Sequence, residues 1–200
     1  TYTITNTSQL NTVPYSQFAE NSLYASYSGD SWKKTGNVVD VTTDFIGSTN
    51  DVDVVFKRNN IKAGVISKND NLSFGVGTLL NINSTASNNS AFGARALNSN
   101  ISGFNNTAVG TNALLSNNAD FNTAVGVGSS FANTSGTSNT SMGHFSLKSN
   151  IIGSGNVSIG NNSLENSVGF YNTALGYLSL FYTTGDQNVA LGWRALENLT

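Results

Sequence analysis

The residues that could carry out acid–base chemistry are sparse in the larger part of the chain. From residue 71 onward the carboxylates are Asp120, Glu165, Asp186 and Glu197. Hydrolysis of a glycosidic bond needs two carboxyl groups about 5 to 10 Å apart. Glu165 and Glu197 form the best pair, since each stands five residues after a recurring glycine, but neither has an evident partner to activate it. We interpret these carboxylates as solvated surface residues and predict that the protein is not an enzyme.

A metal or nucleophilic site finds equally little support. His144 is the sole histidine and the chain has no cysteine. Zinc sites and catalytic triads need further ligands or partners. Three copies of His144 could meet on the axis of a trimer and bind a metal or an anion, which is the weaker alternative. In other repeats the same position holds side chains of many kinds, which indicates a surface column, so we expect no metal and no cofactor.

Composition excludes several classes of protein. Only 10% of the residues are charged and the net charge is −2, which gives no basic surface for nucleic acid. No apolar run approaches the roughly 20 residues that span a bilayer, so we expect no membrane insertion. Asn, Ser and Thr make up about two fifths of the chain and replace charge as its polar residues. The chain begins at Thr1 without a signal-like segment, and we expect it to be part of a longer protein.

Charge is unevenly distributed along the chain. Residues 1–70 hold thirteen of the charged side chains and residues 71–200 hold seven. This shift predicts a boundary near Asp70, with a β-rich adaptor or connector before it and a repeat array after it. Within the adaptor, the alternation of residues 51–56 predicts a strand, and residues 17–27 could form a short helix.

The array contains eight repeats of 16 to 18 residues, which become visible when they are aligned on a glycine. The aligned glycines are Gly75, Gly93, Gly110, Gly126, Gly143, Gly160, Gly176 and Gly192. Four residues before each of them stands an asparagine: Asn71, Asn89, Asn106, Asn122, Asn139, Asn156, Asn172 and Asn188. Two residues before the glycine is Ala or Ser, and one before it is an apolar residue. Four residues after it is Leu, except in the fourth repeat, where Ser130 precedes Phe131 and suggests a one-residue insertion.

These columns predict the fold. Five repeats carry a second glycine, at Gly103, Gly136, Gly153, Gly169 and Gly185, so each repeat has two glycine-marked corners. Such a density of Gly, Asn, Ser and Thr excludes helix. Two strands of four or five residues joined by two turns would form one coil of an all-β, parallel β-roll or solenoid. Stacked asparagines would form amide ladders, and the leucine column and the apolar column before the glycine would supply the core.

The small number of apolar residues per coil predicts that several copies of the chain associate. Two large apolar residues per coil are few against an ordering cost of roughly 1 to 2 kcal/mol per residue. We therefore expect a homotrimer, in which one apolar column faces its own coil and the other faces the shared axis.

The repeat resembles that of a known family. The segments "NTAVGTNAL" (106–114) and "NVSIGNNSL" (156–164) are similar to the head repeat of YadA-like trimeric autotransporter adhesins, which also occurs in bacteriophage tail fibres. The resemblance covers residues 71–200 and implies a trimeric β-roll. Residues 30–60 look like the β-rich segment that precedes such arrays in tail fibres.

The resemblance implies a structural, receptor-binding fibre module of a virion, which extends from the particle and attaches it to a host cell surface. Its partners would be a host glycan or protein and other fibre or particle proteins. The head domain of a bacterial cell-surface adhesin is the first alternative and a polysaccharide-degrading tailspike the second. Aromatic residues near the C-terminus offer a possible ligand surface, with packing in the trimer as the other interpretation: Tyr171, Tyr177, Tyr182 and Trp193.

Overall fold

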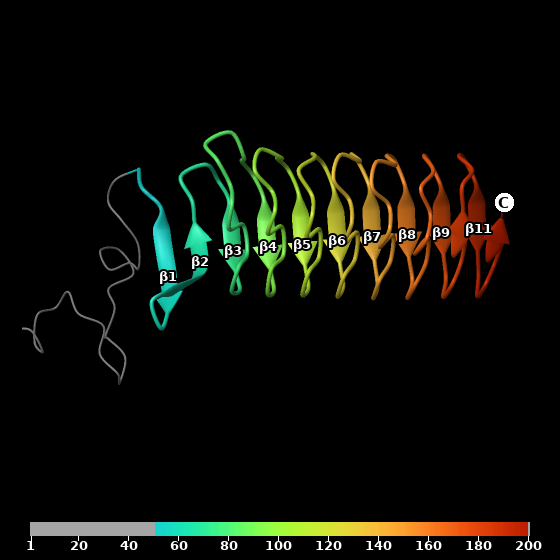
Figure 1. The fold of residues 1–200 in the computed structure, drawn as a ribbon, viewed down its shortest axis with the longest axis horizontal. Coiled ribbons are helices and arrows are strands. Elements are labelled where there is room, and N and C mark those ends of the chain that lie inside the picture. Colours follow the sequence, from blue (N-terminus) through green and yellow to red (C-terminus); the bar gives the residue numbers. More distant parts are fainter. Residues whose placement is uncertain (1–50, 200) are drawn as a thin grey trace, which may run out of the picture. The chain divides into compact units, whose positions relative to one another are not determined.

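The computed structural model describes residues 51–199, which form a β-solenoid without any helix (Figure 1). The helix considered at residues 17–27 and most of the predicted adaptor lie outside the described residues. The solenoid begins with β1 (Val54–Arg58) and β2 (Ile61–Ile66). Eight strands of three residues follow, one for each repeat: β3 (Leu72–Phe74), β4 (Ser90–Phe92), β5 (Thr107–Val109), β6 (Thr123–Val125), β7 (Thr140–Met142), β8 (Val157–Ile159), β9 (Thr173–Leu175) and β11 (Val189–Leu191).

These strands form one sheet in chain order, and the predicted parallel solenoid is confirmed. From β3 to β11 every neighbouring pair is parallel, and equivalent positions of successive repeats lie side by side, as Ala91, Ala108 and Ala124 do. Figure 1 shows the strands as a single row with a turn above and below each one. Each repeat therefore makes one coil, and a given column of the sequence becomes a row along the solenoid.

In the first six repeats each coil has one strand, not the two that the sequence predicted. After the glycine, the chain passes through residues with positive φ, such as Arg95 at 58° and Leu97 at 49°. Backbone in this left-handed region is not extended, so the second side of the coil consists of turns. Its groups still bond along the solenoid, since Leu97 N–H donates to the Ala113 carbonyl at 3.1 Å. A second short sheet forms only near the end, where β10 (Tyr182–Thr183) pairs with β12 (Asn198–Leu199).

An antiparallel hairpin covers the first coil. β1 pairs with β2, and β2 pairs antiparallel with β3. The strand predicted at residues 51–56 is present but begins later, at Val54. Just before it, the Asp53 carboxylate accepts a hydrogen bond from the Lys68 N–H at 3.0 Å. The register shifts between Phe56 and Lys57. A shifted, twisted edge strand resists pairing with other strands.

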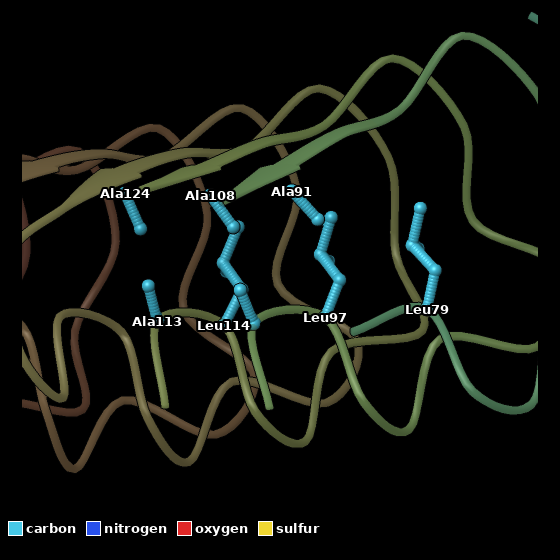
Figure 2. Close-up of a cluster of buried hydrophobic side chains, with 8 residues drawn as sticks. Leu79, Ala91, Leu97, Ala108, Ala113, Leu114 and Ala124 are labelled. Atoms are coloured by element: carbon cyan, nitrogen blue, oxygen red, sulfur yellow. The ribbon is translucent and has the colours of Figure 1, made fainter. Parts of the chain in front are cut away.

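The leucine column fills the coils. Leu79, Leu97 and Leu114 are fully buried and point across the coil toward Ala91 and Ala108 on the strands (Figure 2). The residue opposite each leucine is small because the two sides of the coil lie close together. A second cluster repeats this packing farther along and includes Leu147, Leu164, Ala174 and Leu180.

Ser130 separates the two clusters, and the predicted insertion is wrong. Ser130 is buried and has a φ of 49°, as the leucines do, while Phe131 is only half-buried. The serine therefore occupies the leucine position itself. Its hydroxyl lies 2.8 Å from the Ser141 hydroxyl, which gives both groups a partner inside the core. The fourth coil thus carries a polar substitution at an unchanged backbone position.

Asparagines form a ladder along the whole array. The main-chain N–H of each one from Asn89 to Asn188 donates to the Oδ1 of the asparagine in the preceding coil, at 2.9 to 3.0 Å. In four of these steps the side-chain amide donates to the same oxygen, which is the predicted amide ladder. At every step the ladder therefore bonds the side chain of one coil to the backbone of the next. This connects neighbouring coils more strongly than bonds between stacked side chains alone would.

A second, shorter asparagine row escaped the sequence analysis. Asn100, Asn117, Asn133 and Asn150 each lie seven residues after the repeat glycine and are fully buried. The amides of Asn133 and Asn150 donate to the Oδ1 of the asparagine one coil earlier, at 2.7 and 3.3 Å. The same alignment on the glycine would have revealed this column, because four consecutive repeats share it.

Candidate interaction surface

The apolar column before the repeat glycine adds nothing to the core of its own coil; of the two apolar columns, the leucines face the coil and this one faces outward. In each coil the middle residue of the strand points inward, and the two flanking residues point outward, because side chains alternate along a strand. The third strand residue is therefore an outward apolar side chain in every coil. We call this row the apolar stripe: Phe74, Phe92, Val109, Val125, Met142, Ile159, Leu175 and Leu191. Six of its members are exposed and the other two are half-buried.

The stripe begins with two aromatic rings, and the hairpin places a third beside them. Phe56 of the hairpin lies 5.2 Å from Phe74 between ring centroids, and Phe74 lies 6.0 Å from Phe92 in a stacked arrangement. Gly64 makes room for this contact, since a Cβ there would lie 2.9 Å from the Phe74 ring. The hairpin thus extends the stripe by one residue beyond the array.

A second outward row runs beside the stripe and carries no charge. It consists of the first residue of each strand: Leu72, Ser90, Thr107, Thr123, Thr140, Val157, Thr173 and Val189. All but the last are half-buried. The outer face of the parallel sheet therefore presents apolar and hydroxyl side chains over all eight coils. Such a continuous uncharged face is typical of a surface that contacts another protein.

Two of the four carboxylates accept hydrogen bonds from main-chain N–H groups. Asp120 Oδ1 accepts a hydrogen bond from the Phe104 N–H at 3.0 Å, and Asp186 Oδ1 accepts one from the Phe170 N–H at 2.8 Å. Both bonds cross from one coil to the preceding one. These carboxylates join neighbouring coils, which is a structural role and one that the sequence analysis missed.

Glu165 and Glu197 are each paired with a cation, and the prediction that the carboxylates are solvated is wrong for Glu165. Glu165 is buried; its carboxylate lies 3.1 Å from Lys148 Nζ and also accepts a hydrogen bond from the Asn162 amide. Glu197 accepts from the Arg194 guanidinium at 2.9 Å. This contact raises the pKa of Arg194. Each carboxylate is therefore held by a neighbour of its own.

His144 lies on the surface, in a row whose members in all eight coils are exposed. Its ring is tilted by 35° against that of Phe145, with 3.9 Å between the centroids. Within residues 51–199 no group of three His, Cys, Asp or Glu side chains could hold a metal ion. In the described part of the chain, His144 therefore belongs to no set of three such ligands.

The candidate aromatic residues fall on different rows. Tyr177 and Trp193 occupy the exposed row just after the glycine, in adjacent coils, and the Arg194 guanidinium lies 5.5 Å from the Trp193 ring. Tyr171 precedes the ladder asparagine of its coil and is exposed elsewhere on the solenoid. Tyr182 lies in β10, where it meets the edge of Phe181. The structure therefore brings Tyr177 and Trp193 together in one row, while the other two stand apart.

The described residues include no helix that is long and apolar enough to cross a membrane. Comparisons of the chain with protein-family models, with curated proteins and with solved structures find no match.

Proposed function

We propose that this protein is a non-catalytic, homotrimeric fibre module that mediates attachment to a host cell surface. The observation that carries this proposal is the apolar stripe, which extends along all eight coils on the outer face of one sheet. A tail fibre of a virion is the setting that we favour. The shared repeat also suits the head of a bacterial cell-surface adhesin, and a stalk and membrane anchor in the flanking sequence would favour that alternative.

The stripe supports self-association because its composition is that of an interface core. Burying an apolar side chain such as Val109 or Met142 contributes about 25 cal/mol per Å² removed from water. In the single chain these side chains are exposed. Copies of the chain share the same repeat spacing, so three parallel solenoids can bring their stripes together coil by coil without a change of register.

The ladders support a structural role. Backbone bonds, the asparagine ladder and the leucine column connect each coil to the next. No ladder step depends on a charge, and like charges stacked in one row about 4.8 Å apart would repel. A rod of this kind holds a binding surface at a fixed distance from its attachment point.

Oligomeric state tests the trimer. Sedimentation of the full chain should give the mass of three chains. Val109→Lys places a charge in the stripe and should shift the mass toward that of one chain, with the circular dichroism of the folded protein retained. Thr111→Lys is the matched control, because Thr111 is exposed on the same coil but outside the stripe. A stable monomer of the unchanged chain, or equal dissociation of both variants, would overturn the trimer.

Binding and turnover assays test attachment. Labelled protein should bind to a panel of bacterial surface polysaccharides or to intact bacterial cells, and the Trp193→Ala and Tyr171→Ala variants would identify which aromatic row contributes. New reducing ends after incubation with a polysaccharide would contradict a non-catalytic role and favour a tailspike. Failure to bind any cell or polysaccharide would contradict attachment.

A further inference from the structure

Lys148, Asn162 and Glu165 form one polar cluster on the second side of the fifth and sixth coils. Lys148 Nζ lies 3.1 Å from Glu165 Oε1, and the Asn162 side-chain amide donates to Oε2 of the same carboxylate. Lys148 belongs to the fifth repeat, and the other two residues belong to the sixth. One carboxylate therefore holds an amine and a carboxamide that come from neighbouring coils.

The backbone places this amine beside the carboxamide. The Asn162 N–H donates to the His144 carbonyl at 2.9 Å, so Asn162 lies in the same row as Phe145, one coil later. Lys148 Nζ lies 4.2 Å from the centre of the Phe145 ring. The amine is therefore next to the row position of Asn162, and rotation of the flexible lysine side chain can bring Nζ to the carboxamide carbon.

The cluster is largely shielded from water. The Glu165 side chain is 10% exposed and that of Lys148 is 36% exposed. Their row holds Phe131 in the preceding coil and Phe181 in the following coil, and both rings are half-buried. Apolar surroundings penalise an ion pair. A lysine that passes its proton to a neighbouring carboxylate in such a place becomes a nucleophile.

Stability alone does not explain why charged residues stand here. Equivalent positions of other coils hold Leu115, Phe131 and Phe181. A buried ion pair is seldom more stabilising than apolar residues of similar size. Of the two ion pairs within residues 51–199, that of Lys148 and Glu165 is the one that joins two coils. The cluster therefore has the composition of a reactive site at a position that packing would fill with an apolar side chain.

We propose that Lys148 and Asn162 become joined by an intramolecular isopeptide bond and that Glu165 carries the protons. Glu165 takes a proton from the Lys148 ammonium, and the neutral Nζ attacks Cγ of Asn162. As the Cγ–Nδ2 bond breaks, Glu165 gives its proton to Nδ2 and takes the surplus proton from Nζ. The products are the Nζ–Cγ amide and ammonia, which leaves with the extra proton as ammonium. The carboxylate is regenerated, and nothing is oxidised or reduced.

The bond joins the fifth coil covalently to the sixth. It closes a loop from residue 148 to residue 162, and closing a loop stabilises a fold by restricting the unfolded chain. The reaction occurs once in each chain and turns over no external substrate. The inference is therefore independent of the attachment function.

The mass of the intact chain tests the proposal. The folded full chain should be lighter than its sequence by one ammonia. A protease digest should contain a branched peptide that joins residue 148 to residue 162, and trypsin should fail to cleave after Lys148. Lys148→Arg keeps the positive charge, but a guanidinium is not a nucleophile, so this variant should retain the full mass. Glu165→Gln removes the proton carrier and should also retain it.

Two further variants form a matched pair. Asn162→Ala removes the carbon that is attacked and should retain the full mass. Asn112→Ala changes the equivalent position of the third coil, where φ is 59° against 56° at Asn162, and should still lose one ammonia. The circular dichroism of each variant shows whether its solenoid is folded.

Four outcomes would overturn the proposal. The first is a folded, unchanged chain that has the full mass of its sequence. The second is loss of ammonia from Lys148→Arg, which would indicate that an asparagine has cyclised onto its own backbone. The third is an undiminished loss from folded Glu165→Gln, which would remove the assigned proton carrier. The fourth is a branched peptide that joins any other pair of residues.

Discussion

Oδ1 of Asn106 accepts a hydrogen bond from the main-chain N–H of Asn122 at 2.9 Å, so a side chain of one coil satisfies the backbone of the next. The amide of Asn106 also donates to Asn89 Oδ1 at 3.0 Å and to the Ala119 carbonyl at 2.8 Å. One buried residue thereby connects three successive coils. The repeat of this arrangement along the array explains why no other residue takes its place in any of the eight repeats.

Replacing Asn106 should destabilise the protein strongly. In the Asn106→Ala variant the buried N–H of Asn122 loses its acceptor, which costs about 1 to 3 kcal/mol, while Asn89 Oδ1 and the Ala119 carbonyl each keep one other donor. We expect the free energy of unfolding to fall by about 2 kcal/mol in urea titrations. Asn161→Ala is the control, since Asn161 is exposed and its side chain makes no hydrogen bond within the described residues. Similar losses for the two variants would contradict the ladder's role.

Filling the polar gap in the core should stabilise the protein. Ser130 stands in the leucine column with the same φ as the leucines, and the third coil shows that Leu114 packs well opposite Ala108. Burying a leucine side chain contributes about 1.5 to 3 kcal/mol, from which the lost hydroxyl contact with Ser141 is subtracted. Ser130→Leu should therefore raise the free energy of unfolding by about 1 kcal/mol. A decrease would show that the fourth coil has no room for the larger side chain.

A side chain at the repeat glycine should be poorly tolerated. Gly110 has a φ of 134°, and a Cβ there would lie 2.5 Å from the Gly126 carbonyl oxygen. Gly110→Ala should cost about 3 kcal/mol or more, because both the backbone and the spacing of the coils must change. Gly185→Ala is the comparison, since a Cβ there meets only side-chain atoms at 3.1 Å or more, and Ala119 stands at the equivalent corner. Thermal unfolding of both variants should separate them clearly, and equal midpoints would refute this explanation.

Lys62 should make stability depend on pH in the alkaline range. Burial lowers the pKa of Lys62 below 10.5, and the nearby charge of Asp53 opposes this only in part. The unfolded chain therefore binds more protons than the folded chain in the window between the lowered pKa and 10.5, so the contribution of Lys62 to stability rises with pH across that window. Urea titrations in this window should show a smaller rise for Lys62→Met than for the unchanged chain. Parallel curves would contradict the assignment.

The columns of the repeat determined the general fold. Eight asparagines, eight glycines and seven leucines at a common spacing predicted a parallel all-β solenoid with an asparagine ladder, and the structure has both. This was possible because stacking places each column of the sequence in one row, where like residues must fit the same surroundings. The second asparagine row, which includes Asn100 and Asn117, could be predicted in the same way, because each of its members lies seven residues after a repeat glycine.

Only the tertiary structure decided which side of the coil each column faces. Phe92 and Leu97 are both apolar at fixed positions of the repeat, yet the leucine is buried and the phenylalanine lies in the outward stripe. The sequence pattern alone does not fix this, because left-handed residues such as Arg95 interrupt the alternation between the strand and the second side of the coil. Because of these left-handed residues, the second side of most coils is not a strand. On that side Glu165 is buried and forms an ion pair with Lys148. Stacking explains why the same residue type recurs at one position of every repeat. Whether that side chain points into the coil or toward solvent depends on the backbone path around the whole coil.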